Sequence, residues 1–335
     1  MPADARPNRP AVQPNGHPSP TFRDWWEEFT AMRVNVRPAT LRRDGSIFRC
    51  HLAPAFGETP VDQIGFREAQ RFVADLAATG LAPRTVHKAV GLLSHALEIA
   101  VRSGLLAQNP ARGLALPQIP HQEPRLLDPE EVERLAAAIV KPYRTLVLVG
   151  AYAGLRHGEL AALRVKRVDT TASTIDVAET RTRGSDGTTT FGPPKSRAGR
   201  RTVPVPPFVM DELGVHIAAR GLQPDDLVWT TGSGSPLTES NFRARVWRPA
   251  AVAAGLAGLR VHDLRHTCVA MWSRSLASPR AAAKWAGHSN PALVLGVYGG
   301  VFDDESDAVM TRLSAYAAAD DENEDGESTR NAAEG

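Results

Sequence analysis

The chain has 335 residues, which is enough for about two ordinary domains, each with its own hydrophobic core. With 42% hydrophobic and 23% charged residues, its composition excludes a chain that is mostly disordered or fibrous. The net charge of +2 hides an asymmetry, because the last 16 residues carry seven acids and one base. Residues 1–319 therefore hold 38 bases against 30 acids, a charge of +8, and this basic body favours a polyanionic partner such as nucleic acid.

Cysteine content and hydropathy indicate the compartment. Cys50 and Cys268 lie 218 positions apart, so the sequence offers neither a disulfide framework nor a C-x-x-C pair for metal or redox chemistry. The longest apolar run, residues 145–155, has 11 residues and is too short to cross a bilayer, and no signal-peptide pattern opens the chain. We therefore expect a reduced, cytoplasmic protein that has no membrane association.

The first part of the chain predicts a helical domain. Residues 1–20 contain six prolines and few apolar residues, so we expect a disordered tail there. Thr21 is a candidate N-cap for a helix whose apolar residues, Phe22, Trp25, Trp26 and Phe29, recur at helical spacing. Further helical patterns cover residues 39–52, 65–78 and 83–103. Together these patterns predict an all-helical domain over residues 21–113.

A proline-rich linker is expected at residues 114–127, followed by a second domain at 128–319. A capping-box pattern, Asp128, Pro129 and Glu131, begins the first helix of this domain. An apolar helix through Ala151 follows, and the chain then turns at Gly154. Short runs rich in Thr and Val then predict one small antiparallel sheet, and helical patterns return after it. The predicted strands are 173–177, 188–192 and 201–205, and the predicted helices are 207–219, 239–254, 262–273, 279–286 and 306–318.

The expected fold is thus mainly α with a small antiparallel β-sheet (α+β). The final residues, 320–335, are strongly acidic and are expected to be a second disordered tail.

Five segments of the second domain carry Arg, Lys, His or Tyr in a fixed order. They are Gly154-Leu155-Arg156-His157-Gly158-Glu159, Pro194-Lys195-Ser196 with Arg200-Arg201 after it, His262-Asp263-Leu264-Arg265-His266, Gly287-His288, and Tyr298-Gly299-Gly300. Each segment alone has a structural explanation, for example a helix end or a basic hairpin. Their order and spacing together are far more specific.

This set resembles the tyrosine recombinase (phage integrase) family, and the resemblance covers residues 21–319. It implies that the helical first part is a SAM-like core-binding domain, that the second is the catalytic domain, and that the protein is an enzyme that breaks and rejoins DNA. The implied roles are these: Arg156 and Arg265 clamp the phosphate, Lys195 is the general acid, His262 and His288 are hydrogen-bonding partners, Tyr298 is the nucleophile, and Glu159 supports the site. Two positions depart from the family pattern, Ala286 before Gly-His and Gly300 after the tyrosine, and neither belongs to the catalytic set.

The chemistry of these side chains agrees with the implied roles. Guanidinium groups stay charged at any relevant pH and bind two phosphate oxygens at once, which suits the charge that develops on an attacked phosphodiester. A tyrosine hydroxyl has a pKa near 10, so nearby cations and a histidine acceptor lower the barrier to its attack. The phosphotyrosine product conserves the energy of the broken bond, so strand exchange needs neither ATP nor a metal. We expect no cofactor.

The resemblance also implies partners. The expected ones are double-stranded DNA carrying a specific recombination site, three further copies of the chain in a synaptic tetramer, and a possible accessory protein that bends DNA or sets direction. Integration or excision of a phage or other mobile element is the expected role, and resolution of chromosome dimers is the alternative within the family.

Three classes of protein outside the family fit the sequence less well. His262 and His266 lie four residues apart, as in zinc hydrolases, but Asp263 replaces the usual Glu, Arg265 places a positive charge nearby and no cysteine cluster adds ligands. A DNA-binding module without catalysis would have no reason to keep Tyr298 beside the cationic set. Type IB topoisomerases share the chemistry, but the helical first domain and the length fit a recombinase better.

Overall fold

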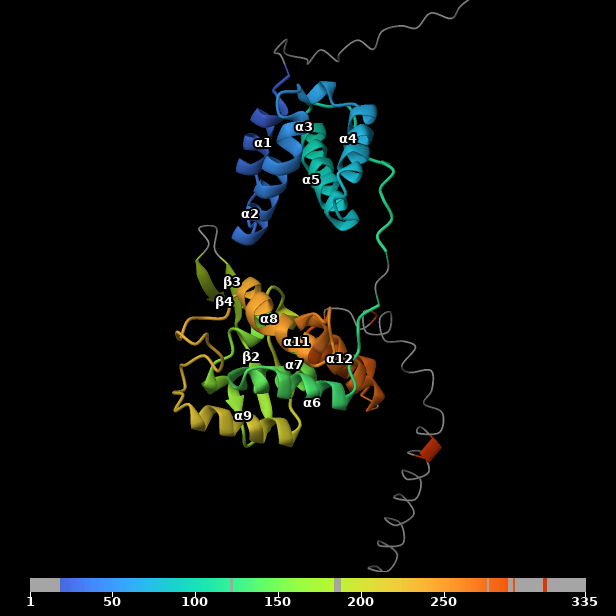
Figure 1. Cartoon of the computed structure of the whole chain (residues 1–335). Coiled ribbons are helices and arrows are strands. Elements are labelled where there is room, and N and C mark those ends of the chain that lie inside the picture. Colours follow the sequence, from blue (N-terminus) through green and yellow to red (C-terminus); the bar gives the residue numbers. More distant parts are fainter. Residues whose placement is uncertain are drawn as a thin grey trace, which may run out of the picture. The chain divides into compact units, whose positions relative to one another are not determined.

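The computed structural model describes residues 19–120, 123–183, 188–275, 277–288, 292 and 310–311. The chain divides into two compact units, Met1–Gln122 with Arg183–Thr188, and Glu123–Thr182 with Thr189–Gly335. Both are rich in helices and appear in Figure 1, coloured from blue to red along the chain. The predicted helix at 306–318 and both predicted tails fall almost wholly outside the described residues, and the domain limits expected from the sequence remain predictions.

The first unit is built from helices around an aromatic core. Trp26 stacks on Phe48 with ring centroids 4.4 Å apart, and the indole N–H of Trp25 donates to the carbonyl of Ala96 at 3.0 Å. Thr21 caps the first helix by accepting from the backbone N–H of Asp24. The helices are α1 (Phe22–Ala31), α2 (Pro38–Ile47), α3 (Ala53–Phe56), α4 (Phe66–Ala78) and α5 (Pro83–Arg102), with a π-helical turn at Phe48–Leu52 and a 3₁₀ turn at Val61–Gln63. This part of the chain is helical, as the sequence predicts.

Two helices contain a π-helical turn just before a proline. The helix predicted at 39–52 continues through the turn Phe48–Leu52 into α3, where Pro54 lies, and the helix predicted at 239–254 has the turn Arg243–Trp247 ahead of Pro249. Proline lacks the N–H that would bond four residues back, and its ring crowds the carbonyl there. The wider turn moves that carbonyl away, so each helix passes its proline without ending.

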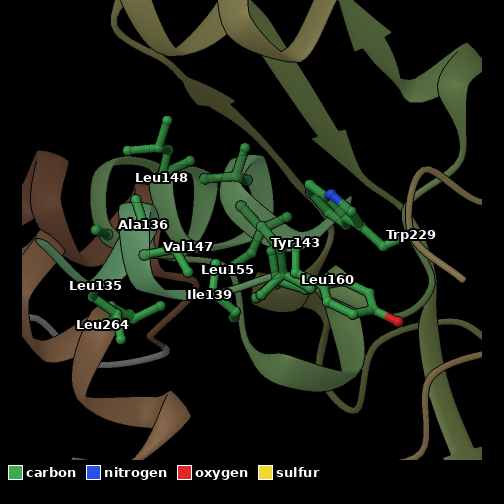
Figure 2. Close-up of a cluster of buried hydrophobic side chains, with 14 of the residues drawn as sticks. Leu135, Ala136, Ile139, Tyr143, Val147, Leu148, Leu155, Leu160, Trp229 and Leu264 are labelled. Atoms are coloured by element: carbon green, nitrogen blue, oxygen red, sulfur yellow. The ribbon is translucent and has the colours of Figure 1, made fainter. Parts of the chain in front are cut away.

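The second unit is organised around α7 (Arg144–Ala153), which packs against four other helices, α6 (Pro129–Ala138), α8 (His157–Leu160), α9 (Pro207–Ala219) and α12 (Val261–Arg274). Figure 2 shows Val147 and Leu148 of α7 among Leu135 of α6 and Leu264 of α12, all of them buried. Trp229 extends this core, and its indole N–H donates to the Thr145 hydroxyl at 3.0 Å. The helices are α6 (Pro129–Ala138), α8 (His157–Leu160), α9 (Pro207–Ala219), α10 (Glu239–Phe242), α11 (Arg248–Ala253), α12 (Val261–Arg274) and α13 (Pro279–Ala286), with 3₁₀ turns at Lys141–Tyr143, Val165–Arg167 and Arg197–Gly199.

The β-structure differs from the single sheet predicted. β2 (Thr174–Val177) pairs antiparallel with β5 (Arg201–Pro204) and with β1 (Val168–Asp169), in the order β1-β2-β5. The run at 188–192 becomes β4 (Thr189–Gly192), which joins β3 (Thr180–Arg183) in a separate two-stranded sheet. The prediction of one sheet was wrong because β3 reads Thr-Arg-Thr-Arg and lacks the apolar alternation that marks a half-buried strand.

The fold class is confirmed as mainly α with small antiparallel β-structure. Among the described residues, none of the helices combines the length and the apolar character that crossing a bilayer requires.

Candidate active site

The site begins where α7 ends. Gly154 has the left-handed conformation (φ 64°), and a Cβ atom there would lie 3.1 Å from the Cys268 sulfur and 3.3 Å from the Trp272 ring. Only glycine combines that backbone conformation with so close an approach to α12. The turn buries Leu155 and places Arg156 at the N-cap of α8.

Arg156 is held in place by a buried carboxylate. Glu159 accepts from the Arg156 backbone N–H at 2.8 Å and from its Nη1 at 2.8 Å. Arg156 Nη2 donates to the carbonyl of Gly287 at 3.0 Å, and the side chain is still 38% exposed. The guanidinium is therefore fixed on one side and open to solvent on the other.

Glu159 is 3% exposed and stays ionised. Burial acts to raise the pKa of its carboxyl, but hydrogen bonds and charge from Arg201, and then from Arg156, outweigh burial and leave the pKa lowered. A buried carboxylate at the base of the site thus keeps its negative charge.

Arg265 projects from α12 into the same region. Its Nη1 donates to the Gly154 carbonyl at 2.8 Å and its Nη2 to the Ala286 carbonyl, and the residue is 3% exposed. Desolvation, followed by the charges of Arg156 and Arg201, lowers the pKa of Arg265 to about 9. The side chain is therefore still a cation at pH 7.

The end of α13 supplies the histidine of the Gly-His segment. Gly287 is left-handed (φ 66°), and a Cβ atom there would lie 2.8 Å from the Ala198 carbonyl oxygen. His288 follows, and its backbone N–H donates to Ala283 at 2.9 Å. Desolvation, and then the charges of Arg265 and neighbouring arginines, lowers the pKa of His288 to about 4, so the ring is neutral at pH 7. Its buried Nδ1 has no hydrogen-bond partner among the described residues.

His262 lies on the first turn of α12. Desolvation, His266 and then the charges of Arg265 and Arg156 lower the pKa of His262 to about 4, so it too is neutral at pH 7. The rings of His262 and His266 are edge to face, with centroids 4.9 Å apart. Asp263 is used by the Arg260 backbone and side chain, and within the described ranges no three His, Cys, Asp or Glu residues are grouped to hold a metal. The zinc alternative therefore gains no third ligand from this part of the chain.

One described residue of the predicted site, Lys195, is not part of this cluster. Lys195 is exposed in the loop between β4 and the 3₁₀ turn Arg197–Gly199, and no hydrogen bond or ion pair to the other described site residues involves it. Tyr298 lies outside the described residues. The structure thus brings together Arg156, Glu159, His262, Arg265 and His288.

Arg201 was not predicted as a site residue, although it lies in the same segment as Lys195. Arg201 is the first residue of β5, where burial alternates so that Arg201 and Val203 point inward. Its Nη2 donates to Glu159 Oε2 at 2.9 Å, and both side chains are 3% exposed. The alternation of Arg201, Thr202 and Val203 is the signal that could have placed this arginine on the buried face.

The cluster as a whole is built for an anion. Three guanidinium groups, those of Arg156, Arg201 and Arg265, surround the single carboxylate of Glu159 and leave an excess of two positive charges. The two neutral histidines, His262 and His288, lie beside these arginines. Such an arrangement can bind an oxyanion and stabilise charge that develops on it.

Comparison with known proteins gives the family. The model of the phage integrase family matches residues 125–304, and that of the phage integrase N-terminal SAM-like domain matches residues 21–77. Tyrosine recombinase XerC of Shewanella amazonensis is 26% identical over 281 residues, covering 80% of this chain and 88% of the relative. The putative prophage phiRv2 integrase of Mycobacterium tuberculosis is 27% identical over 293 residues, covering 85% and 76%.

A solved structure shares the fold. The Tn1549 transposon integrase, in complex with transposon right end DNA, superposes with a TM-score of 0.74 at 20% identity, over 88% of this chain and 99% of the other. The first family model alone spans more than half of the sequence and includes every residue of the arginine and histidine cluster. The chain therefore belongs to the phage integrase family of tyrosine recombinases, the site-specific DNA recombinases.

Proposed function

We propose that this recombinase cleaves a DNA strand by attack of Tyr298 on a phosphodiester and rejoins it through a 3′-phosphotyrosine intermediate. The observation that carries the proposal is that both guanidinium groups are anchored by the protein: Arg156 on the Gly287 carbonyl and the Glu159 carboxylate, and Arg265 on the carbonyls of Gly154 and Ala286. Because both guanidinium groups are fixed before substrate arrives, little reorganisation is needed when charge builds on the phosphate.

Each group then has one task. The arginines neutralise the non-bridging oxygens of the phosphate, while neutral His262 and His288 can each accept or donate a hydrogen bond at pH 7. The tyrosine hydroxyl gives its proton to one of these neutral histidines while its oxygen forms a bond to phosphorus, and the bond from phosphorus to the 5′ oxygen breaks. Lys195, exposed on its loop, gives the leaving 5′ oxygen its proton. The reverse sequence, with a different 5′ hydroxyl, joins the exchanged strand.

We propose double-stranded DNA with a specific recombination site as the substrate, and a tetramer of this chain on two such sites as the working assembly. The +8 charge of residues 1–319 supports a DNA partner. Integration or excision of a mobile element in the cytoplasm is the proposed role, with an accessory DNA-bending or directionality protein. Chromosome-dimer resolution is the second candidate, and the similarity to XerC favours keeping it.

The test uses a nicked duplex of the recombination site, from which the short 5′-hydroxyl fragment diffuses away after cleavage. Wild-type protein should accumulate a protein–DNA adduct that survives denaturing detergent, with or without EDTA. Tyr298→Phe removes one hydroxyl and should abolish the adduct while leaving DNA affinity unchanged.

Tyr152→Phe is the matched control, because it removes the same hydroxyl from a ring that packs edge-on against Phe208, 5.1 Å away. It should form the adduct at the wild-type rate. An adduct formed by Tyr298→Phe, or one that EDTA prevents in the wild type, would contradict the proposed nucleophile or the metal-free chemistry.

A second arm tests Lys195. Lys195→Ala should slow adduct formation because the 5′ oxygen then leaves without a proton. A substrate with sulfur at the 5′ bridging position has a leaving group that needs no proton, so it should restore the rate of this variant. A variant that is equally slow on both substrates would remove Lys195 from the role of general acid.

A further inference from the structure

Arg201 is the buried arginine of the cluster, and four of its five side-chain N–H groups donate to protein acceptors. Nη2 donates to Glu159 Oε2 at 2.9 Å, and Nη1 donates to Glu159 Oε1 at 3.1 Å and to the Gly199 carbonyl at 2.9 Å. Nε donates to the carbonyl of Trp285. With 3% of the side chain exposed and both edges of the guanidinium occupied by protein acceptors, Arg201 lacks the access needed to bind a DNA phosphate itself.

The three acceptors lie on the three segments that present the proposed catalytic groups. Glu159 holds Arg156 on α8, and Gly199 ends the loop that carries Lys195. Trp285 is in the last turn of α13, just before Gly287 and His288. One side chain therefore joins segments that are more than 80 residues apart in sequence.

Packing around Gly287 supports this link. A Cβ atom on Gly287 would lie 3.2 Å from both Cδ and Nη1 of Arg201, so the turn before His288 rests directly on this side chain. Any residue larger than glycine would have to displace the arginine. The turn and the guanidinium thus fix each other's position.

Arg201 also sets the charge of the site. Glu159 is shared by Arg156 and Arg201, so its negative charge falls only partly on Arg156. Without Arg201, Arg156 alone would neutralise the carboxylate, and the excess positive charge facing a phosphate would fall from two to one. Arg201 therefore affects how well Arg156 can stabilise negative charge on a bound phosphodiester, although Arg201 itself does not contact the phosphodiester.

We propose that Arg201 is a positioning residue for strand cleavage, which neutralises Glu159 so that Arg156 remains available to the phosphate and which holds the turn that carries His288. The proposal rests on the proposed function. It assigns to Arg201 an effect on catalysis beyond stabilising the fold.

The experiment compares two nicked substrates that differ at the scissile phosphate, one a phosphodiester and one a methylphosphonate, in which a methyl group replaces a charged oxygen. Without that charge, the reaction depends much less on arginine. At saturating protein, Arg201→Met should lower the rate of adduct formation on the phosphodiester by about 100-fold, the effect typical of losing one preorganised stabilising group. Its defect on the methylphosphonate should be no more than about tenfold.

Arg201→Lys keeps the charge but replaces the fork with a single nitrogen, so it should show a smaller defect with the same preference for the neutral substrate. It also keeps the test valid if the Met variant does not fold. Arg200→Met is the matched control, since Arg200 is exposed and directly precedes Arg201, the first residue of β5. It should leave the saturated rate on both substrates unchanged.

The possible outcomes distinguish failure of the positioning role of Arg201 from failure of the proposed function. If wild-type protein forms no Tyr298-dependent adduct on either substrate, the proposed function fails. If the wild type forms it and a folded Arg201 variant cleaves the phosphodiester at the wild-type rate, or loses both substrates to the same extent, Arg201 is only a structural residue and the inference is overturned.

Discussion

The buried carboxylate Glu159 offers the sharpest prediction about stability. It accepts four hydrogen bonds, from the backbone and Nη1 of Arg156 and from Nη1 and Nη2 of Arg201, at 2.8–3.1 Å. Glu159→Gln keeps the volume, removes the charge and turns an amide donor toward the guanidinium donors. Breaking a buried ion pair from one side costs about 3–5 kcal/mol, so this variant should lose that much from the free energy of unfolding of the second unit.

The two cysteines make the second unit separately measurable. Cys268 on α12 is fully buried, while Cys50 in the first unit is exposed. In a Cys50→Ser background, brief thiol labelling at rising urea concentrations reports only when Cys268 becomes accessible, and the midpoint and slope give the free energy of unfolding. Glu159→Gln should shift the midpoint strongly with little change in slope.

Glu133→Gln is the matched control because Glu133 pairs with Arg144 at the surface, where its side chain is 58% exposed. An exposed pair contributes about 0–1 kcal/mol. Replacing Glu159 and Arg201 together with Met should cost less than the sum of the single replacements, since neither member of this buried pair is then left without the other. If Glu159→Gln costs no more than Glu133→Gln, the argument for a tightly held, buried network is wrong.

Three further predictions concern the hairpin, the histidines and DNA. A Cβ atom on Gly158 would lie 2.7 Å from the Thr180 hydroxyl of β3, so Gly158→Ala should displace β3 and slow cleavage more than binding. The substrate with sulfur at the 5′ bridging position should restore the rate of this variant, because its leaving group does not need a proton from Lys195. Equal slowing on both substrates would contradict this prediction. In the free protein, NMR titration should find His262 and His288 still neutral at pH 6 and protonated only near pH 4, whereas midpoints near 6.5 would contradict the electrostatic account. Affinity for duplex DNA should fall steeply and linearly on a log–log plot against salt, and a flat dependence would remove the phosphate contacts expected of the basic body.

Helices were predictable where local signals agree with packing. A capping residue followed by proline marks the start of α6, at Asp128 and Pro129, and the start of α13, at Ser278 and Pro279. In each case the side chain of the capping residue accepts a hydrogen bond from the backbone N–H three residues later. The π-helical turns were not predictable from periodicity, because they arise from a proline that the helix tolerates. The pairing of β3 with β4 was missed because neither strand has an apolar face that the pattern could reveal.

The site divides in a similar way. The segments that contain Arg156, Arg265 and His288 were visible because each has a short pattern and the patterns follow one another in order. Arg201 was passed over because its importance lies in partners 42 and 84 residues away, which no local pattern records. A buried arginine becomes evident only when the strand that carries it is placed against α8 and α13.

The central claim, that Tyr298 forms the covalent link to DNA, is most directly tested by identifying the linked residue. Trypsin cleaves after Lys284 and Arg312, so the trapped adduct should yield the peptide spanning residues 285–312, which contains a single tyrosine. After nuclease treatment, tandem mass spectrometry should place the remaining nucleotide on Tyr298. A nucleotide on any other residue, or an adduct that leaves this peptide unmodified, would contradict the account.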